Sequence, residues 1–247
     1  FHSICARILR MNIDKIGYDK NFTIYDTGDQ TTLVKEIIKE LGYKDEINPK
    51  EALNIIGFCK NKSLSPEEFA RINTFYTKQE EYYNIYKKYE EKKFEYNALD
   101  FDDLIEKVLV LFAKSPETLR YYQEKFEYVY VDEYQDTNNS QYELIKYFAK
   151  VHNNVVVVGD ADQSIYSFRG ADINNILDFE KDFKDAKVIK LEQNYRSTGN
   201  ILDIANKLIK NNIERKDKKL WTDQKQGEKV FYKTSSVESE EADFVVT

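Results

Sequence analysis

The chain has 247 residues, of which 41% are hydrophobic and 33% are charged, and it holds only 8 glycines and 3 prolines. This composition is typical of a globular protein with one large domain or two smaller ones, and it excludes disordered and fibrous chains. The sequence has no apolar run near the roughly 20 residues that cross a bilayer, and its start lacks a signal-peptide pattern. Two cysteines, Cys5 and Cys59, are too few for a disulfide framework, so we expect inert thiols in a cytosolic protein.

The net charge is −7, which weighs mildly against binding to nucleic acid. Contacts with phosphates need lysine and arginine side chains, and these contacts supply most of the sequence-independent affinity for DNA. A groove can nevertheless be basic on an acidic protein, because the net charge describes the whole surface. The charge alone therefore does not exclude a nucleic-acid partner.

The first 125 residues carry many helix-start signals and little strand pattern. Three segments combine a capping residue with a proline at the first helical position, at residues 48–51, 65–68 and 115–117. A long polar helix is expected between residues 69 and 93. Its tyrosines could pack against a neighbouring helix or form a base-stacking surface, and packing is favoured; they are Tyr82, Tyr86 and Tyr89.

The rest of the chain alternates apolar runs with helical patterns, which predicts an α/β fold with a parallel sheet. Continuous β-branched and aromatic runs suit strands that are covered on both faces. The expected strands are residues 128–131, 155–158 and 188–191, with a further strand at 229–235. The expected helices are residues 140–150, 173–183 and 201–209, with one more beginning near the end of the chain.

A pair of acids, Asp132 and Glu133, directly follows the first of these strands. Side chains at the carboxyl end of a parallel strand face the crevice where α/β sheets bind ligands. In ATPases the first acid of such a pair holds magnesium and the second orients the attacking water. Residues 132–136 contain three acids and an amide, which is costly unless a cation or a hydrogen-bond network uses them. The alternative is a solvated acidic turn in which Asp136 or Asn138 caps the next helix.

A second polar run, residues 159–171, follows the next strand. Gln163 could bind a phosphate oxygen or the attacking water. Tyr166, Phe168 and Arg169 combine aromatic faces with a cation, which suits single-stranded nucleic acid. The alternative is that the apolar side chains pack in the core and Arg169 pairs with a nearby acid.

A third run, residues 191–198, ends the third expected strand. Arg196 could reach a transferring phosphoryl group from the opposite side of a cleft, and Tyr195 offers a stacking face. Taken together, the three runs resemble motifs II, III and IV of the UvrD/PcrA/Rep family of superfamily 1 DNA helicases, and most closely its PcrA branch. Further matches are residues 1–3, which resemble the end of a Thr-Phe-His-Ser segment, and residues 99–104.

The resemblance covers essentially the whole chain and implies its domain organisation. It implies a partial RecA-like parallel sheet of the P-loop NTPase class, with a mainly α-helical inserted subdomain. Residues 1–22 would belong to motor domain 1A, residues 23–100 to the helical insert 1B, residues 101–187 to the rest of 1A, and residues 188–247 to the start of motor domain 2A.

The resemblance also implies roles for individual residues with ATP and Mg²⁺ as cofactors. Asp132 would hold magnesium, Glu133 would be the catalytic base, and Gln163 would sense the γ-phosphate and link it to DNA. Tyr195 would stack on adenine and Arg196 would reach the γ-phosphate. The residues implied at DNA are His2, Ser3, Phe101, Tyr166, Phe168 and Arg169. Relatives often carry tryptophan at the position of Phe168, so we expect a weaker base contact there.

No Gly-x-x-x-x-Gly-Lys-Ser/Thr loop occurs in the 247 residues. The backbone amides of that loop cradle the phosphates, and its lysine neutralises them. In the family it lies upstream of the segment that resembles Phe1, so the chain resembles an internal fragment. We therefore expect the isolated fragment not to turn over ATP, and its open sheet edges could pair with another chain.

The resemblance favours an ATP-dependent 3′–5′ DNA helicase or translocase. Single-stranded DNA and duplex junctions would be its partners, repair or replication proteins are possible ones, and the protein would work in the cytoplasm at the nucleoid. One alternative is the helicase subunit of an AddA/RecB-type helicase–nuclease, which would need a nuclease domain downstream. The other is a non-catalytic DNA- or protein-interaction module that kept the fold; the intact acids and Arg196 argue against it.

Overall fold

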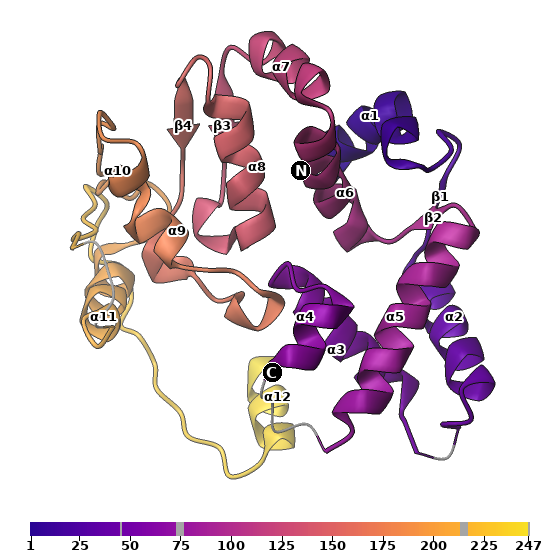
Figure 1. Ribbon diagram of the computed structural model, residues 1–247. Coiled ribbons are helices and arrows are strands. Elements are labelled where there is room, and N and C mark those ends of the chain that lie inside the picture. Colours follow the sequence, from indigo (N-terminus) through magenta and orange to yellow (C-terminus); the bar gives the residue numbers. More distant parts are fainter. Residues whose placement is uncertain (45, 73–76, 213–216, 247) are drawn as a thin grey trace. The chain divides into compact units, whose positions relative to one another are not determined.

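The computed structural model describes residues 1–44, 46–72, 77–212 and 217–246, except the side chain of Arg169. The chain divides into two compact units, Phe1–Phe179 and Glu180–Thr247, and each is described by itself. Helices dominate both units, and short parallel strands occur in the first (Figure 1). The mixed α/β class is thus confirmed. None of the helices in the described ranges is long and apolar enough to cross a membrane.

The first core of unit one brings the start of the chain against helices that come a hundred residues later. α1 (His2–Asn12) runs into a short 3-10 turn, η1 (Ile13–Ile16), and packs on α6 (Phe101–Lys114). α7 (Pro116–Lys125) and α8 (Asn139–Ala149) complete this core. Its buried apolar side chains include Ile8, Leu9, Val108, Leu111 and Phe112.

A second core lies in the helical block of α2 (Thr27–Glu40), α3 (Pro49–Asn61), α4 (Pro66–Arg71) and α5 (Gln79–Glu95). The cap and proline signals at the starts of α3 and α4 are confirmed, with a full capping box between Ser65 and Glu68. The tyrosines of α5 are buried in this core, so the packing interpretation is right; they are Tyr82, Tyr86 and Tyr89. Two parallel strands join the block to the first core: β1 (Thr23–Ile24) and β2 (Ala98–Leu99).

The expected single helix from 69 to 93 is wrong. α4 ends at Arg71, Ile72 has an extended backbone, and α5 begins only at Gln79. The Gln79 side-chain amide donates to the carbonyl oxygens of Phe69 and Ile72, at 3.0 and 2.7 Å. These bonds satisfy carbonyl groups that the end of α4 leaves open, and they stabilise a break that the apolar spacing does not signal.

The α/β part of unit one is a two-stranded parallel sheet, with Val129 paired to Val155 and Val131 to Val157. Its strands are β3 (Val129–Val131) and β4 (Val155–Val157), and α8 packs against one face. Tyr130 is 72% exposed on the other face. Both strands were expected to be covered on both faces, so that part of the prediction is wrong for the described residues.

Two further strand predictions fail in unit two. Residues 188–191 form no strand, and Ile189 and Leu191 are 69% and 79% exposed. Residues 229–235 are likewise irregular. A single parallel bridge joins Gln193 to Trp221, within the described part of this unit. The expected helices form as α11 (Gly199–Ile209) and α12 (Glu238–Val246), whereas residues 173–183 hold two short helices, α9 (Asn174–Leu177) and α10 (Phe179–Asp182).

Both cysteines are buried free thiols. Burial raises the pKa of the Cys5 thiol to about 12 and that of the Cys59 thiol to about 11. The thiolate is the reactive form of cysteine, and at neutral pH almost none of it is present at either position. The expectation of buried thiols without a disulfide is confirmed for both cysteines.

Candidate nucleotide and nucleic-acid site

The acidic pair lies at the carboxyl end of β3, as its spacing predicts. Asp132 and Glu133 are both exposed. Glu133 adopts a left-handed backbone with φ 49° and ψ 44°, and its amide donates to Asp132 Oδ1 at 2.9 Å. Left-handed geometry is uncommon for a residue other than glycine and concentrates at functional turns. The tight turn holds the two carboxylates in one fixed arrangement at the strand end.

Gln135 is the structural centre of this turn. Its side chain is only 1% exposed. The Gln135 Nε2 amide donates to Glu133 Oε2 at 2.8 Å, and Gln135 Oε1 accepts from the amide of Asp160 at 2.9 Å. The sequence shows an amide among the acids, but nothing in the spacing identifies it as the link between the ends of β3 and β4.

Gln163 joins the same hydrogen-bond chain from the second polar run. It closes a short 3-10 turn, η3 (Ala161–Gln163), and its Nε2 donates to Asp160 Oδ2 at 2.8 Å. Ser164 Oγ donates to the carbonyl oxygen of Gln135 at 3.3 Å. A continuous chain therefore runs from Glu133 through Gln135 and Asp160 to Gln163, so the structure brings the two predicted motifs together.

Glycine at position 159 is required by this close approach. A Cβ atom there would lie 2.7 Å from Gln135 Oε1, 3.0 Å from Ile176 Cδ1 and 3.1 Å from the backbone nitrogen of Tyr134. Cβ contacts below 3.0 Å force something to move. The absence of a side chain thus lets the two strand ends meet.

Asn138 and Asp136, the remaining polar residues of the first run, behave differently: one caps a helix and the other belongs to the acidic turn. Asn138 caps α8, as the alternative reading expects, and forms a capping box with Gln141. Asp136 lies closer to the site, and burial first and the charge of Glu133 second raise the pKa of its carboxyl. The run is therefore both a helix start and a hydrogen-bonded acidic turn.

The aromatic residues predicted to contact DNA form two pairs within unit one. Tyr166 and Phe168 have ring centroids 5.9 Å apart, and Phe168 is 76% exposed. Phe168 lies in the 3-10 turn η4 (Ser167–Arg169). His2 meets Phe101 edge to face at 6.0 Å, and Phe101 is half exposed at the start of α6. Exposed rings of this kind can stack on bases.

Ser3 and Arg169 are the other two residues predicted to contact DNA. Ser3 is exposed on α1. The side chain of Arg169 lies outside the described part of the chain, so its predicted contact stays a prediction.

The third predicted run forms an ordered turn in unit two. Asn194 Oδ1 accepts from the backbone amides of Arg196 and Ser197, at 2.9 and 2.7 Å. Tyr195 is 77% exposed, and Gln224 Nε2 donates to its carbonyl oxygen at 2.7 Å. The backbone of the turn is fixed while the Tyr195 ring and the exposed Arg196 remain accessible.

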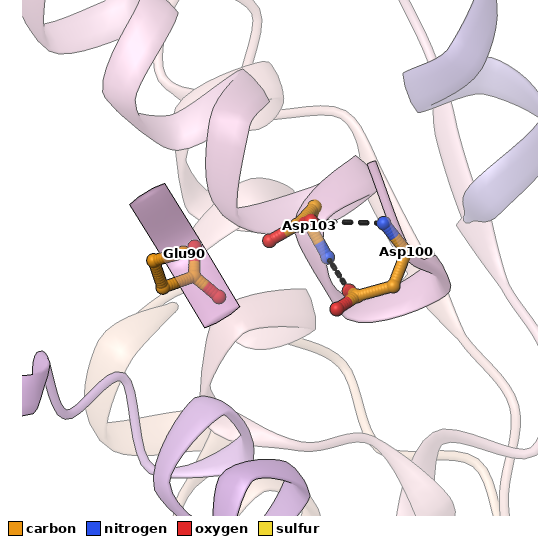
Figure 2. A group of neighbouring side chains, drawn as sticks. All are labelled: Glu90, Asp100 and Asp103. Atoms are coloured by element: carbon orange, nitrogen blue, oxygen red, sulfur yellow. Dashed lines mark hydrogen bonds between the residues drawn. The ribbon is translucent and has the colours of Figure 1, made fainter. Parts of the chain in front are cut away.

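Three carboxylates in the helical block lie close enough to share a cation: Glu90, Asp100 and Asp103. Figure 2 shows them together, with reciprocal hydrogen bonds that join Asp100 and Asp103. Lys60 Nζ lies 2.5 Å from Asp103 Oδ1, and Lys93 Nζ lies 2.5 Å from Asp103 Oδ2. Lysine ammonium groups already provide the positive charge, so these acids form a buried ion network and not a metal site.

The acids of the strand end fit a magnesium ion better. Magnesium prefers carboxylate oxygens and is usually held by one or two carboxylates together with substrate phosphates and water. Asp132 presents an exposed carboxylate whose orientation is fixed by the Glu133 amide. This donor chemistry matches a magnesium ion that arrives with a nucleotide.

Comparison with known proteins agrees with these motifs. Residues 1–184 match the UvrD/REP helicase N-terminal domain, and residues 189–247 match the UvrD-like helicase C-terminal domain. The chain is 49% identical over 246 residues to the ATP-dependent DNA helicase PcrA of Bacillus subtilis, covering 99% of this chain and 33% of that protein. It is 48% identical over 248 residues to PcrA of Staphylococcus epidermidis, covering 100% of this chain and 34% of that protein. The same identity over 247 residues, with the same coverage, relates it to PcrA of Staphylococcus aureus.

The chain belongs to the UvrD/REP helicase family, and the resemblance seen in its sequence is confirmed. It spans about a third of the length of the PcrA proteins that it matches.

Proposed function

We propose that the full-length protein is an ATP-dependent 3′–5′ DNA translocase and helicase. The observation that carries the proposal is the hydrogen-bond chain from Glu133 through Gln135 and Asp160 to Gln163. This chain links an acidic pair suited to ATP hydrolysis with the run that carries Tyr166 and Phe168. Nucleotide chemistry and a DNA-binding surface therefore share one rigid framework.

In this proposal Asp132 holds the magnesium that accompanies ATP, and Glu133 is the general base. The ion, when bound, neutralises charge on the phosphate oxygens. Glu133 accepts a proton from the attacking water, and Gln135 keeps its carboxylate aimed by donating to Oε2. Gln163 hydrogen-bonds the γ-phosphate and changes partner when that phosphate leaves. In unit two, Arg196 stabilises the charge on the γ-phosphate and Tyr195 stacks on the adenine.

The proposed DNA contacts rely on stacking more than on charge. Exposed aromatic faces bind bases without sequence preference and do not require an overall positive surface. This explains how a chain with a net charge of −7 could bind single-stranded DNA. The contacts we propose are His2, Ser3, Phe101, Tyr166, Phe168 and Arg169.

We further propose that residues 1–22 and 101–187 form one motor domain, with residues 23–100 inserted and residues 188–247 beginning a second. Because the 247 residues contain no phosphate-cradling Gly-Lys loop, they should not hydrolyse ATP by themselves. β3 and β4 pair only with each other among the described residues. The isolated chain is therefore expected to self-associate through these strand edges, which sedimentation would detect.

The proposal is tested by Glu133→Gln in the full-length protein. Removing a general base lowers kcat by roughly 10²–10⁴-fold, while binding of ATP should remain because Asp132 is unchanged. Glu127→Gln is the matched control, since Glu127 is an exposed acid just before the same strand. Turnover above roughly a hundredth of the wild-type rate, the lower limit of that effect, would refute the base assignment. DNA binding without any ATP turnover by the wild type would favour a non-catalytic module, and nuclease activity would favour a helicase–nuclease subunit.

A further inference from the structure

The last turn of α3 makes a direct contact with the start of α8. Asn61 Oδ1 accepts from Asn138 Nδ2 at 3.1 Å. The Asn61 Nδ2 amide donates to the carbonyl oxygen of Gly57 at 2.9 Å, which orients the side chain. Asn138 is the cap of α8 and follows the turn that carries Asp132 and Glu133. A residue of the helical block is thereby hydrogen-bonded to the end of the acidic turn.

The side chain of Asn61 also lies against residues 166–170, called here the aromatic loop because they include Tyr166 and Phe168; the contact is at Gly170. Gly170 has a φ of 85°, and a Cβ atom there would lie 2.9 Å from Asn61 Cβ and 3.2 Å from Asn61 Oδ1. The backbone that follows Phe168 therefore rests directly on Asn61. Only glycine satisfies both the left-handed backbone and this close approach.

The end of α3 is itself rigidly held. Lys60, the neighbour of Asn61, is fully buried in the ion network and bonds Asp100 and Asp103 at the start of α6. Ser63 Oγ lies 3.1 Å from Ser140 Oγ on α8. A fixed α3 end makes Asn61 a rigid support between the aromatic loop and the cap of α8.

We propose that Asn61 is a positioning residue that couples DNA binding at the aromatic loop to ATP hydrolysis at the acidic turn. This inference rests on the proposed function. A bound base that displaces the loop would move Gly170 against Asn61. The shift of the Asn61 side chain would then change the length of its hydrogen bond to Asn138. Loss of that bond weakens the coupling between the two sites and leaves each of them assembled, because the link through Gln135 remains.

The test compares ATP turnover by the full-length protein with and without single-stranded DNA. Asn61→Ala removes the bond to Asn138. Asn138→Asp also removes it, since a carboxylate cannot donate, yet it keeps a good helix cap because Asp and Asn cap equally well. Asn54→Ala is the control, on an exposed position of the same helix.

We expect the ratio of DNA-stimulated to basal turnover to fall roughly threefold to tenfold in Asn61→Ala and Asn138→Asp, the factor that loss of one hydrogen bond supplies. Basal turnover of both variants should stay close to wild type, and Asn54→Ala should leave the ratio unchanged. The ratio does not depend on how much of a preparation is folded, so a partly unfolded variant still gives an answer.

A wild-type stimulation ratio in both Asn61→Ala and Asn138→Asp would overturn the inference and leave the proposed function intact. Equal losses of basal and stimulated turnover would also overturn it, because they would indicate a structural role only. A wild-type protein without ATP turnover would overturn the proposed function, and this inference with it.

Discussion

Replacement of Lys60 by methionine should destabilise the helical block strongly. Lys60 Nζ lies 2.5, 2.7 and 3.1 Å from oxygens of Asp103, Asp100 and Glu90. Burial alone would lower the pKa of Lys60, but Asp103, Glu90 and Asp100 raise it well above the usual value, so the side chain is charged. Methionine fills a similar volume without the charge.

The magnitude follows from the charge balance of the buried ion network. Its members are three ammonium groups and four carboxylates: Lys60, Lys93, Lys107, Glu90, Asp100, Asp103 and Glu106. Without Lys60, Asp100 and Asp103 lose one of the two ammonium groups that contact them, and a further negative charge is left uncompensated in the interior. Breaking a buried pair in this way costs about 3–5 kcal/mol. This exceeds what the methyl and methylene groups of methionine recover.

The assay is hydrogen exchange of the α3, α5 and α6 amides in the full-length protein, because a protein of several domains does not unfold in two states. Exchange through local opening should accelerate roughly a hundredfold to a few thousandfold, as 1.4 kcal/mol corresponds to tenfold. Lys50→Met is the control, since Lys50 is exposed on the same helix. Adding Asp100→Asn to Lys60→Met restores the original net charge of the network and keeps the α6 cap. This double variant should recover part of the protection. Equal exchange rates in Lys60→Met and Lys50→Met would contradict the expected destabilisation of the helical block.

Three further outcomes are expected. Phe168→Ala should weaken binding of single-stranded DNA by roughly 1–3 kcal/mol, the value of one stacked base, and Phe168→Trp should strengthen it; titration with a fluorescent oligonucleotide measures both. Gly159→Ala should lower kcat for ATP hydrolysis, because the added Cβ would lie 2.7 Å from Gln135 Oε1 and would displace that oxygen. Burial alone would raise the pKa of Glu90, but its lysine neighbours lower it to about 2, so the helical block should lose stability as the pH falls from about 4 to about 2. Glu90→Gln should flatten this decline in an acid titration followed by circular dichroism.

A specific result would contradict each of these three predictions. Unchanged oligonucleotide affinity in Phe168→Ala would remove that ring from the DNA surface. Gly57→Ala is the control for Gly159→Ala, since a Cβ at Gly57 meets nothing within 4 Å, and equal kcat in the two would discount the close approach. A lowered carboxyl pKa stabilises the folded state above the unfolded pKa and loses that effect below the folded one. Identical acid titrations of wild type and Glu90→Gln would therefore contradict the pKa shift.

The local signals in the sequence predicted much of the fold. Capping residues with prolines located the starts of α3, α4 and α7, and the valine-rich runs located β3 and β4. The same kind of run failed at residues 188–191, where no strand forms. An apolar run reports a tendency to be buried, but a strand also needs a neighbour with which to pair. In the described residues the nearest pairing is the single bridge from Gln193 to Trp221.

The sequence predicted which residues form the candidate site, but not the hydrogen bonds that join them. Asp132, Glu133 and Gln163 were identified from position and residue type. Gln135, which joins them, carries no signal of its own, because its role depends on β4 lying beside β3. The buried ion network was missed for the same reason. Lys60 and Asp103 are 43 residues apart, and charged residues in helices are normally read as solvent-facing.

We propose that this chain carries the catalytic acids and the DNA-coupling residues of an ATP-driven motor. The most direct measurement is steady-state ATP hydrolysis by the full-length protein, with and without single-stranded DNA, beside the same assay on the 247-residue chain. We predict strong stimulation by DNA in the full-length protein and no turnover by the 247 residues alone. Hydrolysis that ignores DNA, or steady turnover by the 247-residue chain, would contradict the account.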